Sequence, residues 1–197
     1  YKVGSSYEPG GITGISHALE HMMFRGTTKY GPGELDRIVA ENGGKQNAFT
    51  SFDFTGYYQV LAANKLSISF ELEADRMRNL LLRSEDFTKE IQVVMEERRM
   101  RTEDNPQQQT LEYFMASANI VEPYHHLPIG WMNDLQNMKV EDLREWYQRW
   151  YAPNNAILVV VGDVKSTEVY QLAQKYFGSI KPSVLPTVKP QKEVKSL

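Results

Sequence analysis

Two histidines and a glutamate lie within five residues near the start of the chain, in the order His17, Glu20 and His21. If this segment is helical, the two imidazoles stand about 40° apart on the helix surface, and the carboxylate lies in the same ~100° arc. Two neutral imidazoles one turn apart can bind one divalent ion, and a carboxylate beside them can take the proton of a bound water. The spacing therefore indicates a metal site. The alternative is a pair of histidines that lie on the surface or pack without binding a ligand.

A third ligand must come from elsewhere, because zinc sites use at least three protein ligands. The segment 85–103 is predicted to be helical and offers Glu90, Glu96 and Glu97. Glu90 and Glu97 lie within about 20° of each other on one helix face, whereas Glu96 is turned ~100° away from Glu97. One of the pair could bind the metal while the other orients a ligand. By itself, this charged pattern favours a solvated helix face.

The composition limits both the ligands and the partners. Because the 197 residues include no cysteine, any metal must be held by histidine or carboxylate side chains. The net charge of −3 gives no basic surface, which argues against nucleic acid as a partner. No apolar run approaches the ~20 residues that a membrane span needs. A hydrophobic content of 41% is enough for one sizeable core.

The elements that position these residues follow from hydrophobic spacing and turn residues. The helix with the histidines is predicted over 14–24, with Thr13 as its cap. Because helices and strands are mixed without strict alternation, the sequence predicts an α+β fold, a two-layer domain with helices packed on one mixed, largely antiparallel sheet. We expect further helices over 32–42, 66–82, 87–101, 107–119, 139–151 and 167–177, two strands within 45–62, and a buried strand over 156–161.

Both ends of the sequence are interpreted as cut from a longer product. The chain starts at Tyr1 without an initiator methionine or a leader peptide. Residues 179–197 contain three prolines and no helical period, which is typical of a linker.

Several further blocks of the sequence occur in a fixed order. In that order they resemble the pitrilysin family of zinc peptidases, which includes insulin-degrading enzyme and the mitochondrial processing peptidase. The H-x-x-E-H spacing of the first block is the signature of inverted zincins. The resemblance covers nearly the whole chain, and its blocks are His17–Thr27, Asn47–Ser51, Val94–Arg98, Pro123-Tyr124, Ile129–Trp131, Tyr151–Ala156 and Val160–Asp163.

The resemblance implies a role for each candidate residue. His17, His21 and Glu97 would bind one zinc ion, and Glu20 would be the general base that deprotonates the zinc-bound water. Glu90 matches a supporting acidic residue of the family, which we count with Glu20 among the catalytic residues. The helical-wheel argument agrees with this assignment of Glu97.

The segment Asn47, Ala48 and Phe49 is interpreted as an edge strand, which can pair with an extended peptide through main-chain hydrogen bonds. The resemblance implies that this strand holds the scissile peptide over the zinc, although the sequence alone fits an ordinary sheet strand. His125 and His126 are adjacent and lie between prolines, so we expect them to be structural.

The predicted function is that of a zinc-dependent endopeptidase acting on extended or unfolded peptides. Members of the family resemble a pair of similar domains that close as a clamshell. We therefore expect residues 1–178 to form the zinc-binding half, with the linker 179–197 leading to a missing second half. A second homologous domain or subunit, or a homodimer, would complete the enzyme, and the fragment alone is expected to bind metal but cleave poorly.

Two alternatives remain open. The chain could be a non-catalytic core or partner subunit of a processing-peptidase-like complex, or a domain that uses zinc for stability alone. Two histidines and a glutamate suit zinc better than manganese or cobalt. The resemblance to bacterial two-domain members favours the periplasm or another extracytoplasmic site.

Overall fold

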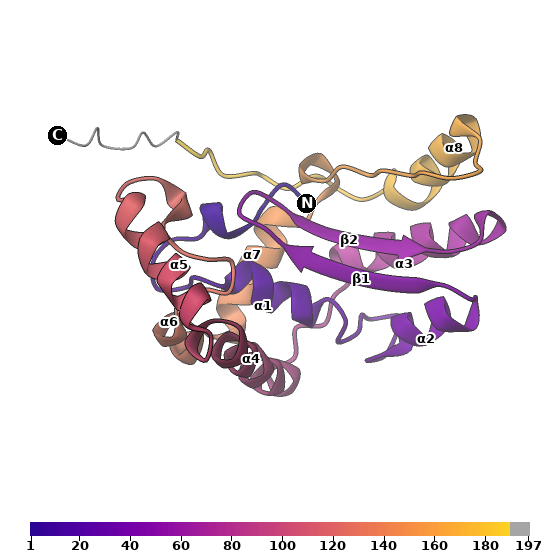
Figure 1. Ribbon diagram of the computed structural model, residues 1–197. Coiled ribbons are helices and arrows are strands. Elements are labelled where there is room, and N and C mark those ends of the chain that lie inside the picture. Colours follow the sequence, from indigo (N-terminus) through magenta and orange to yellow (C-terminus); the bar gives the residue numbers. More distant parts are fainter. Residues whose placement is uncertain (190–197) are drawn as a thin grey trace.

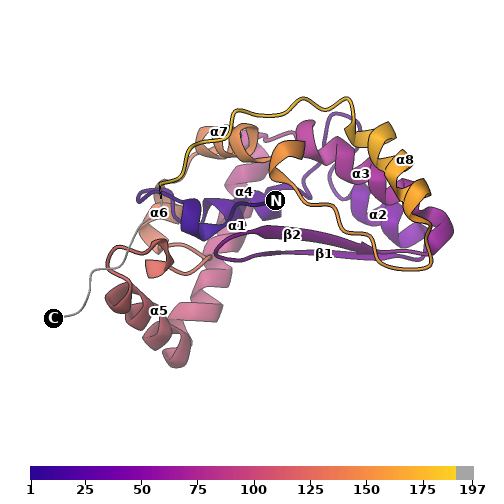
Figure 2. The same ribbon diagram turned by 90° about the horizontal axis from the view of Figure 1, so that it is seen from above.

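A hairpin of two antiparallel strands lies against a layer of helices in the computed structural model, which describes residues 1–189 (Figure 1). β1 (Lys45–Thr50) pairs with β2 (Thr55–Val60) so that Lys45 is opposite Val60. Aromatic and β-branched residues such as Phe49 and Tyr57 favour these strands. Figure 2 shows α1, α2 and α3 on one face of the hairpin.

The helices follow the order that the sequence predicts, apart from α6, which the hydrophobic pattern does not indicate. Short 3₁₀ turns lie at Ser5–Tyr7, Ala63–Lys65, Pro123–His125 and Pro153–Asn155, and a π-helical turn at Arg99–Glu103 extends α4. The helices are α1 (Ile15–Met22), α2 (Glu34–Glu41), α3 (Leu66–Arg78), α4 (Ser84–Arg98), α5 (Pro106–Ala118), α6 (Met132–Asn137), α7 (Val140–Trp150) and α8 (Ser166–Phe177).

Two apolar clusters hold these helices together. The larger one joins α1, α4 and α7, where Leu19, Val94 and Leu143 are fully buried. The smaller one joins α2 and α3 through Leu35, Val39 and Leu72. Each such side chain contributes about 1.5–3 kcal/mol on burial. The larger cluster therefore fixes α1 relative to α4, the two helices that carry the candidate ligands.

The α+β fold class with helices layered on a largely antiparallel sheet is confirmed, and within residues 1–189 the sheet consists of the β1–β2 pair. The helix predicted over 66–82 ends at Arg78, and Leu80 instead forms an isolated bridge with Thr27. No helix in the described part of the chain is both long and apolar enough to span a membrane.

The buried strand predicted over 156–161 is wrong. This segment is assigned to no strand, and Ile157, Val159 and Val161 are 71%, 73% and 91% exposed. Its β-branched residues favour extended backbone. A strand also needs a hydrogen-bonding neighbour, and within the described residues this segment has none.

The cap predicted for α1 is also wrong. The helix begins after Gly14, whose φ of +86° lies in the left-handed region that favours glycine. The Thr13 hydroxyl donates to Asp134 instead of capping the helix. A Cβ on Gly14 would lie 2.7 Å from the Ile129 carbonyl oxygen, so two loops pack here backbone against backbone.

The structure describes residues 179–189 of the predicted linker. Residues 179–189 contain no helix or strand, and the Ser183 hydroxyl donates to the Gln148 carbonyl oxygen at 2.9 Å. The remainder of that prediction, residues 190–197, lies outside the described residues.

Candidate metal centre

The two histidines of α1 point the same way. They lie four residues apart on the helix, and their Nε2 atoms are 3.3 Å from each other. His17 is buried, whereas the His21 side chain is 20% exposed. Two successive turns of the helix thus present two imidazole nitrogens at one place.

Glu97 on α4 completes a group of three. Its Oε2 atom lies 3.3 Å from His21 Nε2 and 3.7 Å from His17 Nε2. Zinc binds histidine nitrogen and carboxylate oxygen at ~2.0–2.2 Å, so neighbouring ligands of a tetrahedral ion lie about 3.3–3.5 Å apart. The three atoms therefore form the triangle that a zinc ion requires. Within residues 1–189, these are the His, Asp and Glu side chains close enough to share one ion.

Glu90 contacts the group of three through the far side of the His21 ring. Its Oε2 is 3.3 Å from His21 Nδ1, and its other oxygen pairs with the Arg25 guanidinium. A buried carboxylate that accepts the Nδ1 proton leaves Nε2 free for a metal, which is the usual partnership of a ligating histidine. Glu96, by contrast, is turned outward and pairs with Arg99 at 2.8 Å. The separation of Glu96 from Glu90 and Glu97 that the helical wheel predicts is confirmed.

Arg101 engages the second oxygen of the Glu97 carboxylate. Its guanidinium lies 2.6 Å from Glu97 Oε1, while Oε2 faces the histidines. The pKa of Glu97 is lowered, first by the hydrogen bond from His21 and then by nearby positive charge. The carboxylate is therefore ionised, as a metal ligand must be.

The pKa values of the two imidazoles are shifted in opposite directions. Burial and then the charge of His21 lower the pKa of His17 to about 4, so this ring is neutral at physiological pH. Burial also acts to lower the pKa of His21, but the hydrogen bond and charge of Glu97 outweigh it and raise the value. Of the two rings, His21 therefore holds its proton more tightly.

Glu20 projects from α1 beside the strand β1. The Thr50 hydroxyl of β1 donates to Glu20 Oε2, and burial raises the pKa of this carboxyl. The negative charge of Glu97 also raises the pKa of Glu20. Glu20 is thus close to the metal group but is not one of its three members. A carboxylate with a raised pKa beside a metal site is well suited to proton transfer.

The edge of β1 that faces away from β2 is available to a ligand. The bond from Ser51 N to Phe54 O at 2.9 Å fixes which residues of β1 bond to β2. Since bonding directions alternate along an antiparallel strand, the N–H and C=O groups of Ala48 face outward. Among the described residues, the partner of this N–H is the adjacent Asn47 side chain, at 2.8 Å.

Two buried carboxylates that the sequence analysis did not single out hold the amino end of α1. Glu8 accepts from the N–H groups of Gly14 and Ser16 at 2.7 and 2.8 Å, and Asp134 accepts from Thr13 N and Oγ1 at 3.1 and 2.6 Å. They occupy the helix end where unpaired N–H groups need an acceptor. An acidic residue a few positions ahead of a Gly-rich loop that leads into a helix was the available signal.

His125 and His126 lie apart from the metal group. His126 is buried, with Nδ1 close to the Leu127 carbonyl oxygen and 4.0 Å from Glu8, and His125 Nδ1 lies 3.0 Å from the Glu122 carbonyl oxygen. Both are placed as structural side chains, as the sequence predicts.

Both the sequence and the fold are similar to those of known proteins. Residues 1–127 match the profile described as Insulinase (Peptidase family M16), and residues 137–196 match that of the Peptidase M16 inactive domain. The zinc protease PqqE of Helicobacter pylori is 44% identical over 181 residues, which are 92% of this chain and 41% of that protein. The chain therefore spans about two fifths of this relative.

Two solved structures share the fold. A crystal structure of a protease from Helicobacter pylori has a TM-score of 0.95 at 43% identity and covers 99% of this chain and 47% of its own. The first half of the periplasmic protease PqqL from Escherichia coli has a TM-score of 0.83 at 25% identity, over 97% of this chain and 42% of that half.

Proposed function

The chain belongs to the insulinase family of peptidases, M16, and from this premise we propose that it is the zinc-binding half of an endopeptidase that cleaves extended or unfolded peptides. Curated relatives bear the name zinc protease. The observation that carries the proposal is the triangle of His17 Nε2, His21 Nε2 and Glu97 Oε2, with sides of 3.3 to 3.7 Å.

His17, His21 and Glu97 would hold the zinc ion. When bound, zinc supplies Lewis acidity that lowers the pKa of a coordinated water toward ~7. Three protein ligands leave one position open, which distinguishes a catalytic site from a purely structural one. Glu90 is a positioning residue, because it contacts the His21 ring and not the reacting atoms.

Glu20 is the proposed general base. It takes the proton of the attacking water and then returns it to the leaving amine. Its raised pKa, caused by burial, brings it nearer to that of an activated water. The hydroxyl of Thr50 orients the carboxylate by donating to one of its oxygens.

The substrate would lie along β1. Asn47, Ala48 and Phe49 form the part of this strand next to Thr50 and thus next to Glu20. A peptide that adds to a strand edge is bound through its main chain, so its side chains are selected only weakly. This mode of binding favours extended or unfolded segments over folded proteins.

A second half would complete the enzyme. One relative of known structure is the first half of a periplasmic protease, which supports a two-half arrangement and an extracytoplasmic location for this protein. We propose that residues 1–178 are the zinc-binding domain and 179–197 the connection to a second homologous domain or subunit. Residues 1–197 alone would bind one zinc ion and turn over substrate slowly.

Glu20→Gln in the full-length enzyme is the test. We expect zinc content to stay at one ion per chain, measured by elemental mass spectrometry, and the rate of peptide cleavage to fall ~10²–10⁴-fold, as is typical when a general base is lost. Gln keeps the shape and still accepts the Thr50 hydrogen bond, so folding is preserved.

Three results would contradict the proposal. Full activity in the variant would remove Glu20 from its role. If wild-type protein takes up no zinc, the chain is a non-catalytic subunit instead. If zinc is bound but neither the wild type nor the variant cleaves peptides, the ion is structural.

A further inference from the structure

Arg76 of α3 places a positive charge in the interior of the protein. Its side chain is fully buried, and a buried guanidinium is costly unless its charge and its N–H groups have partners. Glu73, on the preceding turn of α3, accepts from Nε at 2.9 Å and from Nη2 at 2.5 Å. The Glu73 side chain is 20% exposed, so this ion pair extends from the core to the surface.

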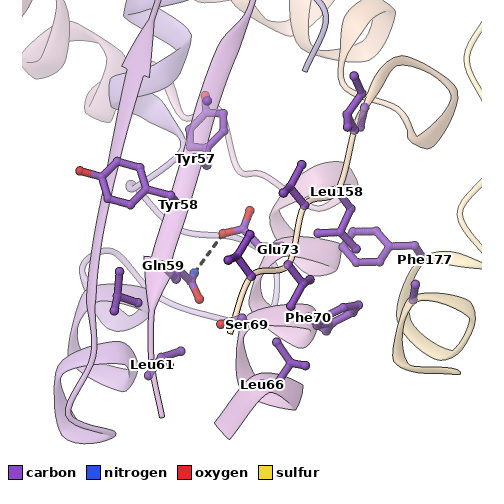
Figure 3. A pocket seen from close by; sticks show the side chains of 18 of the residues that line it. Tyr57, Tyr58, Gln59, Leu61, Leu66, Ser69, Phe70, Glu73, Leu158 and Phe177 are labelled. Carbon is purple, nitrogen blue, oxygen red and sulfur yellow. Dashed lines mark hydrogen bonds between the residues drawn. The ribbon is translucent and has the colours of Figure 1, made fainter. Parts of the chain in front are cut away.

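The Glu73 end of the pair is tied to the hairpin. It lies in an apolar groove along the edge of β2 that faces away from β1, with Leu66 and Phe70 among the lining residues. In Figure 3, the amide of Gln59 on β2 points at Glu73, to which it donates at 3.0 Å. The same amide nitrogen donates to Gln46 Oε1 of β1 at 3.2 Å. The ion pair of α3 is therefore linked to both strands.

The Arg76 end of the pair lies over two aromatic rings. Its guanidinium carbon is 4.5 Å from the centre of the Tyr57 ring and 5.3 Å from that of the Phe24 ring. Within residues 1–189, Nη1 has no hydrogen-bond partner, and the faces of the two rings can receive its N–H groups instead. Arg76 thus holds together two rings whose centres are 6.4 Å apart.

These two rings belong to the elements that position Glu20. Phe24 follows the C-terminal end of α1, four residues after Glu20. Tyr57 lies on the same face of the hairpin as Thr50, whose hydroxyl donates to Glu20. Burial raises the pKa of Tyr57, and the negative charge of Glu20 adds to the shift. Phe24 and Tyr57 therefore meet close to the contact between Glu20 and Thr50.

The backbone of Arg76 is anchored as firmly as its side chain. The Tyr147 hydroxyl of α7 donates to the Arg76 carbonyl oxygen at 2.9 Å and accepts from Leu80 N at 3.1 Å. Tyr147 belongs to the larger apolar cluster, which also fixes α1 relative to α4. Arg76 thus connects the hairpin to the part of the core that holds the candidate metal ligands.

We propose that Arg76 is a positioning residue, which sets the distance between α1 and the hairpin and so aligns Glu20 with the β1 edge. The inference rests on the function proposed above, in which Glu20 is the general base. Apolar packing of α1 against α4 arranges the metal ligands, whereas Arg76 arranges the base relative to the strand. Its loss should therefore affect cleavage and not metal binding.

Arg76→Lys in the full-length enzyme tests this role. Lysine keeps the charge and can pair with Glu73, but lacks the planar fork that reaches the carboxylate and both rings together. We expect kcat to fall about 10–100-fold, as for a misplacement of ~1 Å, with KM nearly unchanged. Zinc affinity, measured by chelator competition, should stay the same. Arg37→Lys, in an exposed ion pair with Glu41, is the matched control and should change neither.

Combination with Glu20→Gln separates positioning from a general structural role. If Arg76 acts through Glu20, Arg76→Lys should lower the remaining activity of Glu20→Gln by less than about twofold. An equal loss in both backgrounds, or weakened zinc binding, would overturn the proposal. Full activity in Glu20→Gln alone would instead overturn the proposed function, and this inference with it.

The metal-free protein gives a readout that needs no catalysis. The NMR signal of the Thr50 methyl group reports the contact with Glu20. Arg76→Lys should move this signal toward its position in Glu20→Ala, whereas Arg37→Lys should leave it in place. If Arg76→Lys does not fold, Phe24→Leu removes one ring and leaves the buried ion pair intact, and we expect the same direction of shift. An unmoved Thr50 signal in the folded variant would overturn the proposal.

Discussion

The two edges of the same hairpin are built differently. β1 exposes the side chains of Lys45, Asn47 and Phe49 on one face, and the strand lies beside Glu20 and the metal group. The outer edge of β2 faces an apolar groove and is already paired with Tyr1 at one end. The two edges of one hairpin therefore border different surroundings, a group of candidate metal ligands on one side and apolar side chains on the other.

The Glu97→Ala variant tests whether the β1 edge differs from the β2 edge in having a metal site beside it. If the β1 edge functions through the metal beside it, removal of a ligand should weaken zinc binding by more than the ~10–100-fold typical of an outer partner. Chelator competition measures the affinity. Glu96→Ala is the matched control, because Glu96 is exposed and pairs only with Arg99 among the described residues. Equal loss in both variants would mean that the charge of α4 matters and not the ligand.

Glu90→Gln tests whether the Glu90 carboxylate orients the His21 ring for metal binding. Its amide can still approach His21 Nδ1 but carries no charge to favour the Nδ1–H tautomer. We expect zinc affinity to fall ~10–100-fold, with the fold intact by circular dichroism. Unchanged affinity would show that the core packing of α1 against α4 is enough to orient the ring.

The amino end of α1 predicts a pH dependence. Burial raises the pKa of Glu8 from 4.5 to about 7. The folded state therefore holds this proton more tightly than the unfolded state, so stability falls as pH rises from about 5 to about 8. The change is on the order of 2–3 kcal/mol.

Denaturant titrations of the metal-free protein at both pH values measure the Glu8 contribution. Glu8→Gln cannot ionise and should lose this part of the pH dependence. Glu141→Gln, at an exposed glutamate, should keep it. A slope that survives in Glu8→Gln would assign the effect to another group.

N-methylation of peptide substrates tests the β1 edge with the smallest expected effect. Methylation of an amide that bonds to β1 should lower kcat/KM about 5–10-fold, the loss of one hydrogen bond worth ~1 kcal/mol. Methylation of the next amide, which faces away, should change little. A scan along the substrate should therefore alternate, and a flat scan would argue against strand pairing.

Most of the metal group could be predicted from the sequence because its geometry is local. His17 and His21 share one helix, and the wheel separates Glu96 from the Glu90–Glu97 face. The predictions that failed concerned residues whose structure depends on partners far away in the sequence. The segment 156–161 has the composition of a strand, but no strand bonds to it within residues 1–189. Glu8 and Asp134 were missed because they act on α1 through loop backbone, which leaves no periodic pattern.

Arg101 has a consequence for how the metal is coordinated. Its guanidinium pairs with Glu97 Oε1, while Oε2 faces the histidines. The ion pair would therefore favour Oε2 as the oxygen that binds a metal. A bidentate carboxylate would add a fourth protein atom to the ion and crowd the place of a water. An exposed side chain outside the group of three ligands would thus help to keep one coordination position open.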